Sequence, residues 1–129
     1  MIDRTGWPRG EWDSEPDEDA WTDEATGLAC RAARSIYSGA WHGYVRVPEG
    51  HPLHGAGVGD GRLNDLDVHG SVWHVGPIFD EGWWLGFDCA HDGDLQPGRE
   101  HSHHGMYCSL AYVKAQCAKL ARQVMEVVK

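Results

Sequence analysis

The 129-residue sequence has no run of apolar residues long enough to cross a membrane, although 41% of its residues are hydrophobic. A membrane-spanning helix needs roughly 18 or more consecutive apolar residues, so no membrane span is expected. The first residues also have neither the basic start nor the apolar stretch of a secretion signal. We therefore expect a cytoplasmic protein, and a chain of this length fits one domain with its own core.

Positive charge is scarce, because 11 lysine and arginine residues stand against 20 acidic residues, for a net charge of −9. Residues 1–26 carry −7 of that charge. The rest of the chain has no basic surplus with which to release counterions from a phosphate backbone, so duplex nucleic acid is not an expected partner. Residues 1–25 also contain Trp7, Trp12 and Trp21. We expect an acidic arm over 1–25 that docks through its tryptophans on a single domain formed by 26–129.

Closely spaced cysteines are absent. The four cysteines contain no Cys-x-x-Cys pair, and the His-Glu-x-x-His motif of zinc proteases is also missing, so no specific zinc motif is present. Reduced thiols are expected at Cys30, Cys89, Cys108 and Cys117. Cys117 falls on an apolar helical stripe and is expected to be a small buried side chain.

The C-terminal part has the clearest periodic pattern. Its apolar residues recur at spacings of three and four, with Ser109 as the expected N-cap, which predicts an amphipathic helix over 109–128. Alternating or branched residues predict strands at 41–47, at 66–68, resuming at 71–75, and at 83–87. The expected fold class is therefore α+β: a small, mainly antiparallel sheet with long loops and one C-terminal amphipathic helix packed on it.

Histidine and aspartate, by contrast, gather in three short clusters on glycine-rich segments, at 50–55, 67–70 and 88–94. Imidazole and carboxylate groups that converge from separate turns are the ligands of a zinc-like ion, or the acid and base of an enzyme. The candidate metal ligands are His51, His69, His91 and Asp94. Asp88 is the candidate catalytic residue, with the alternative role of orienting one imidazole from behind.

Two further residues are candidates for ligand binding, namely Trp84 and His54. Neighbouring residues on a strand point to opposite faces, so one indole of the Trp83-Trp84 pair should be available for stacking. His42 and His74 lie within predicted strands and are expected to be structural. The polar tract 101–104 is expected to be a solvated loop.

Several segments resemble a family of small uncharacterised proteins of tailed phages and prophages, especially those of actinobacteria. The segments are Ala25–Leu28, Gly43–Val45, Gly50–Pro52, Val68–Gly70, Trp83–Asp94 and Tyr112–Lys114. The resemblance covers most of residues 21–125 and implies a phage-borne cytoplasmic protein, but it brings no established activity with it. The chain departs from the family pattern at Ser71, where a second glycine usually follows the His-Gly pair.

Three functions are compatible with these features. The first is a phage-encoded accessory protein with a His/Asp site that holds a zinc-like ion and hydrolyses a phosphoester or an amide. The second is capture of a host nucleotide or signalling molecule without turnover. The third is a host-protein-binding module in which the histidines are structural. The expected partner is accordingly a small molecule or a host protein, and the pattern does not define an oligomeric state.

Overall fold

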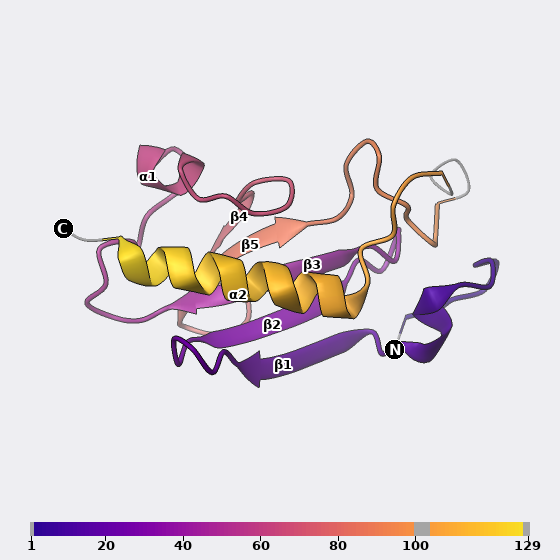
Figure 1. Ribbon diagram of the computed structural model, residues 1–129, viewed down its shortest axis with the longest axis horizontal. Helices are drawn as coiled ribbons and strands as arrows, with labels where there is room; N and C mark the ends of the chain where they lie inside the picture. The colour runs from indigo at the N-terminus through magenta and orange to yellow at the C-terminus, as the bar shows by residue number, and fades with distance from the viewer. Residues whose placement is uncertain (1, 100–103, 128–129) are drawn as a thin grey trace.

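The computed structural model describes residues 2–99 and 104–127. Its centre is a five-stranded antiparallel sheet in the order β1-β2-β3-β5-β4, and helix α2 lies along one face of that sheet (Figure 1). The predicted α+β fold is therefore confirmed. The elements are η1 (Glu11–Ser14), β1 (Glu18–Thr22), β2 (Ala29–Arg34), β3 (Trp41–Val47), α1 (Gly61–Asn64), β4 (His74–Gly76), β5 (Trp83–Asp88) and α2 (Leu110–Glu126).

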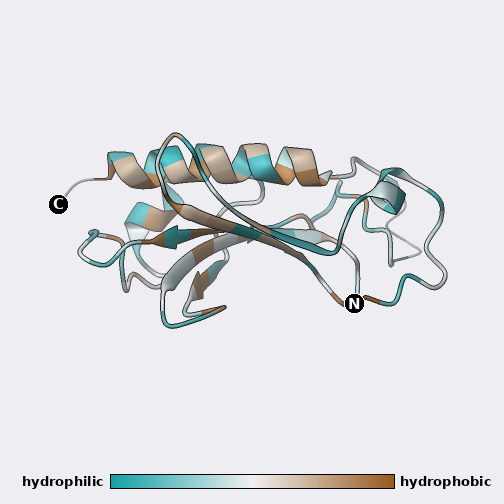
Figure 2. Ribbon diagram, turned by 90° about the horizontal axis from the view of Figure 1, so that it is seen from below, coloured by the Kyte–Doolittle hydropathy of each residue, from teal (hydrophilic) through white to brown (hydrophobic). Residues whose placement is uncertain are grey.

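Helix α2 forms where the apolar period predicts it. Ser109 is the N-cap, because its hydroxyl accepts a hydrogen bond from the amide of Tyr112 at 3.1 Å. The predicted stripe is buried against the sheet through Val113, Cys117, Leu120 and Val124. Figure 2 shows the helix as a separate layer above the sheet, with hydrophilic and hydrophobic residues alternating along it. Among residues 2–99 and 104–127, the helices are too short or too polar to span a bilayer.

The two faces of the sheet have different compositions, because successive strand residues point to opposite sides. In β3 and β5 the face under α2 is apolar, with Val45, Leu85 and Phe87 fully buried in the core and Trp83 partly buried. The opposite face is polar and aromatic. On it the rings of His42 and His74 stack at 4.9 Å, and His74 Nε2 lies 2.8 Å from a carboxylate oxygen of Asp88. His42 and His74 therefore lie on the face that α2 leaves open.

Three predictions about the strands need correction. The predicted strand at 66–68 is wrong, since the amides of Asp67 and His69 donate to side-chain oxygens of α2, namely Gln123 Oε1 and Gln116 Oε1, instead of joining a ladder. The predicted strand at 71–75 is present only as the short β4. The expected separation of an arm over 1–25 is also wrong, because β1 pairs with β2 as the edge strand of the sheet.

The N-terminal segment is fixed to the sheet by a buried ion pair. The Arg34 side chain is fully buried and lies 2.9 Å from Glu15. Glu15 also accepts hydrogen bonds from Tyr107 and from the amide of Leu110, the first residue of α2. The carboxylate of Glu15 therefore connects the N-terminal segment to the sheet and to the start of α2. The N-terminal segment and the start of α2 lie toward the same end of the molecule (Figure 1).

Candidate metal centre

Three chain segments meet beside the first turn of α2. The loop between α1 and β4 provides His69, the segment after β5 provides Cys89, His91 and Asp94, and Cys108 directly precedes the N-cap of α2. The segment after β5 is held in place by hydrogen bonds from Leu95 N to Met106 O and from Met106 N to Gly93 O, each 2.9 Å long. This clamp brings the residues around Asp94 next to those around Cys108.

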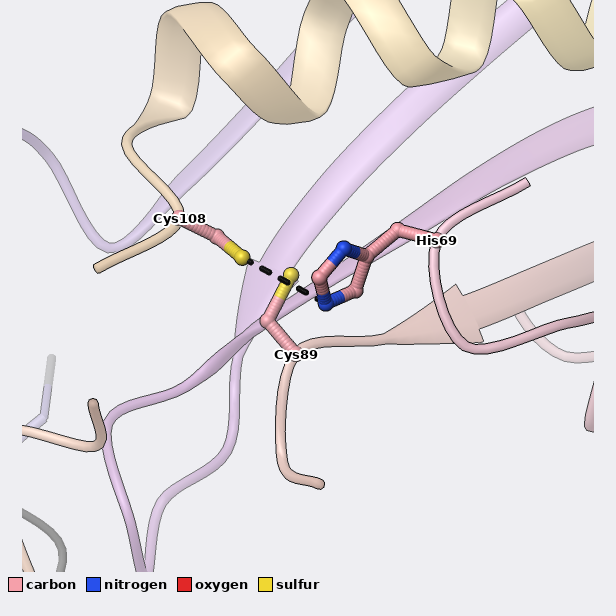
Figure 3. A group of neighbouring side chains, drawn as sticks. All are labelled: His69, Cys89 and Cys108. Atoms are coloured by element: carbon pink, nitrogen blue, oxygen red, sulfur yellow. Dashed lines mark hydrogen bonds between the residues drawn. The ribbon is translucent and has the colours of Figure 1, made fainter. Parts of the chain in front are cut away.

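The first group of candidate ligands consists of His69, Cys89 and Cys108. Their ligand atoms all lie within 4.8 Å of one another, and His69 Nε2 is 3.6 Å from Cys108 Sγ. Figure 3 shows the three side chains pointing toward one another from separate segments. Cys89 and Cys108 are only 2% and 5% exposed. One imidazole and two thiolates are a donor set that suits zinc.

The second group consists of His69, His91 and Asp94, whose ligand atoms also lie within 4.8 Å of one another. His69 Nε2 is 2.9 Å from Asp94 Oδ1, and His91 Nδ1 is 3.4 Å from Asp94 Oδ2. The same nitrogen of His69 thus faces Cys108 on one side and Asp94 on the other. His69 Nε2 belongs to both groups and can bind only one ion. An ion held by His69, Cys89 and Cys108 would therefore lie next to the Asp94 carboxylate and the His91 imidazole.

The ring nitrogens that face away from this point have partners of their own. His69 Nδ1 lies 2.8 Å from the hydroxyl of Tyr112, and His91 Nε2 lies 3.4 Å from Asp88. Such outer partners fix the orientation of metal-binding imidazoles. The hydrogen bond with His74 is the main reason that the pKa of Asp88 is lowered to about 2, so Asp88 is a carboxylate at neutral pH. Asp88 therefore lies behind His91 as a positioning group.

The inward nitrogen of His91 faces the carboxylate of Asp94, at 3.4 Å, without a hydrogen bond to it. Nδ1 of His91 is buried, and no hydrogen-bond partner for it exists among the described residues. Gly70 packs directly against this ring: its φ is +69°, and a Cβ there would overlap the imidazole. A buried polar atom without a hydrogen bond is energetically costly. The residues present therefore fit a cation, which a free imidazole nitrogen can bind.

The thiol of Cys89 is held in its protonated form when no cation is beside it. Its hydrogen bond with Cys108, followed by its burial and the neighbouring acidic groups, raises the pKa of Cys89. A metal ion reverses this preference because it binds the thiolate. Without a cation the site therefore contains a neutral Cys89 thiol, and both thiols are buried away from solvent.

The other side of the site opens into a polar cavity of about 300 Å³. His91 and Asp94 line this cavity together with Asp92, Gly93 and Gln96. The His91 side chain is 37% exposed and can be reached from this cavity, whereas Asp94 and the two thiols are buried.

Of the predicted metal ligands, the structure brings together His69, His91 and Asp94 but not His51. His51 Nε2 donates to the carbonyl of Val124 at 2.7 Å, and His51 Nδ1 accepts from the amide of Leu53 at 3.0 Å. Both nitrogens are thus used at the opposite end of α2. The prediction that His51 is a metal ligand is wrong for this reason.

The predicted ligand-binding residues also lie elsewhere. Trp84 is only 3% exposed, and its indole nitrogen donates to Asp80 Oδ1 at 3.0 Å, so it offers no stacking surface. His54 lies beside Trp83, with ring centroids 6.1 Å apart, and is not part of either ligand group. Within the tract 101–104, residues 101–103 lie outside the described residues, and His104 lines the 300 Å³ cavity.

Cys89 and Cys108 are the candidate ligands that the sequence analysis missed. They are separated by 18 intervening residues and belong to no recognised cysteine motif. The available signal was the position of Cys89 between Asp88 and His91 in the densest His/Asp cluster.

The position of His51 leads to a prediction that separates stability from metal binding. Replacing His51 by alanine removes a hydrogen bond to one of the last carbonyls of α2, so we expect a loss of about 1 kcal/mol in the free energy of unfolding. Metal content should not change. Urea unfolding monitored by circular dichroism, together with metal analysis of the same sample, checks both expectations; a selective loss of metal would contradict the assignment.

Comparison with protein-family models, with curated proteins and with solved structures found no match for this chain. The resemblance to phage proteins therefore stays a prediction.

Proposed function

We propose that this protein binds a zinc-like ion through His69, Cys89 and Cys108 and uses it in hydrolysis. The observation that carries the proposal is the convergence of one imidazole nitrogen and two buried thiols within 4.8 Å. Bound Zn²⁺ lies about 2.0–2.3 Å from nitrogen and sulfur ligands, so small side-chain movements suffice to close three such atoms around an ion. Soft sulfur ligands favour zinc over magnesium or calcium, which prefer oxygen.

The arrangement around this group supports a catalytic rather than a purely structural ion. Catalytic zinc sites have about three protein ligands and one position open to water or substrate. Here the open side faces Asp94 and His91 and the polar cavity. Asp94, whose carboxylate lies 2.9 Å from His69 Nε2, would be the group that accepts a proton from such a water, and Asp88 would hold the orientation of His91.

These features favour hydrolysis of a phosphoester or an amide, because both reactions need an activated water and a proton acceptor. The resemblance to phage proteins adds the proposal that the reaction takes place in an infected bacterial host. An alternative is that the histidines have only a structural role. Both ring nitrogens of His51 and Nε2 of His74 have hydrogen-bond partners, which supports this alternative at those two residues. His91 gives it less support, because Nδ1 forms no hydrogen bond with any described residue and has only Asp94 nearby, at 3.4 Å.

Metal analysis of protein purified without a histidine tag tests the proposal. We expect about one equivalent of zinc per chain, because a single ion satisfies the shared nitrogen of His69. Replacement of zinc by cobalt(II) should give the absorption bands of a thiolate-bound, tetrahedral ion. Hydrolysis of model phosphoesters and amides should stop on chelation and return with zinc. A protein that neither retains nor takes up zinc would exclude the proposal.

A further inference from the structure

A second cavity adjoins the candidate metal centre. It has a volume of about 710 Å³ and lies beside the β2–β3 loop and the start of β3, on the face of the sheet that α2 leaves open. Ala90, Gln96 and Arg99 line both this cavity and the 300 Å³ cavity that contains His91 and Asp94. The two cavities are therefore neighbours, and a molecule bound in the larger one can extend to the candidate centre. Binding cavities for small molecules commonly measure about 300–1,000 Å³.

Charge at the larger cavity comes from one cation and one carboxylate. Arg99 is exposed and forms no ion pair with any residue of the described ranges 2–99 and 104–127. The carboxylate of Asp88, in contrast, lies near two imidazoles, 2.8 Å from His74 and 3.4 Å from His91. The guanidinium is thus the charge left to bind a ligand. Its planar set of donors matches phosphate better than any other side chain does.

The remaining lining residues favour a flat group with hydrogen-bond donors. Tyr37 lines the cavity and is 85% exposed. An exposed aromatic ring offers a stacking surface for a planar base. Gln96 is 5% exposed, and its Oε1 is buried without a hydrogen-bond partner among the described residues. That acceptor needs a donor, such as an amino group of a base or a ribose hydroxyl.

We infer that the larger cavity binds a phosphorylated nucleoside, with its phosphate on Arg99, its base against Tyr37 and its polar groups near Gln96. The role of the nucleotide as a substrate rests on the proposed function, because the bound nucleotide would then be presented to His91 and Asp94 for hydrolysis. The binding site itself depends only on the residues of the cavity.

Calorimetric titration with the four ribonucleoside monophosphates tests the inference. Inorganic phosphate, ribose 5-phosphate and the free nucleosides serve as comparison probes. At least one nucleotide should bind about tenfold more tightly than each of these, since a phosphate contact and a stacked base should each contribute about 1.4 kcal/mol, which is a factor of ten in the dissociation constant. Arg99→Gln should raise the dissociation constant of that nucleotide about tenfold or more, with binding of the free nucleoside unchanged. Arg9→Gln, on an exposed residue of the N-terminal segment, is the matched control.

Zinc content is measured on the same samples, so that the two proposals fail separately. Nucleotide binding by protein without zinc supports the cavity and excludes the proposed function. Zinc without nucleotide binding overturns only the inference about the cavity. Equal affinity for ribose 5-phosphate and for all four nucleotides contradicts recognition of the base, and an Arg99→Gln variant with unchanged affinity contradicts the phosphate contact.

Discussion

Replacing Cys89 or Cys108 by alanine should abolish stable zinc binding. Each substitution removes one of three converging ligands, and even loss of an outer partner of a metal site lowers affinity about 10–100-fold. Loss of a ligand itself should therefore lower the affinity by more than about 100-fold. Competition with a chromophoric chelator gives the dissociation constants of zinc, and cobalt(II) spectra show whether thiolate coordination is lost.

The chain provides a matched control for this experiment in Cys30. This cysteine is as buried as the other two, but its sulfur lies in the core of the sheet beside the carbonyl of Leu28 and belongs to neither ligand group. Cys30→Ala should keep full zinc affinity even if it loses some stability. If Cys89→Ala and Cys30→Ala bind zinc equally well, the thiols are not ligands, and the group of His69, His91 and Asp94 becomes the candidate instead.

The candidate site could be predicted only in part from the sequence. His69 and Asp94 stand next to glycines, and His91 lies two residues before Gly93, in turns that end buried segments, which is a local signal for a positioned polar side chain. His51 has the same local signal. Its ring nitrogen instead bonds to Val124, 73 residues away, and that contact is set by how the helix lies on the sheet. Local composition therefore identified polar turns but could not show which of them meet.

The fold shows the same division between local and long-range causes. Helix α2 has a strong period and its own N-cap, so its bounds could be predicted to within two residues. Strand β2 consists of alanine, arginine and one cysteine, which have little strand preference, and it is a strand because β1 and β3 pair with it on both sides. The segment 66–68 looks strand-like but bonds to glutamines of α2, which no local pattern indicates.

Replacing Glu15 by alanine should cause a large loss of stability, because the carboxylate is the partner of the fully buried Arg34. Removing one partner of a buried ion pair typically costs about 3–5 kcal/mol, since the remaining charge is left without compensation. We expect about 3 kcal/mol here, because Asp17 remains 3.4 Å from Arg34. The amide of Leu110 also loses its acceptor. Urea unfolding of zinc-free protein measures this change.

Two further variants show whether the buried charge is the cause. Glu49→Ala changes an exposed glutamate and should alter the free energy of unfolding by less than about 0.5 kcal/mol. The double variant Glu15→Ala/Arg34→Met removes both charges, so it should be more stable than Glu15→Ala alone. Without this recovery, the loss would have to come from the hydrogen bonds of Glu15 with Tyr107 and Leu110. Tyr107 and Leu110 flank Cys108 and Ser109 in the sequence. If the loss of stability comes from their hydrogen bonds with Glu15, the N-terminal segment positions the thiol of Cys108. Zinc affinity should then fall together with stability in Glu15→Ala.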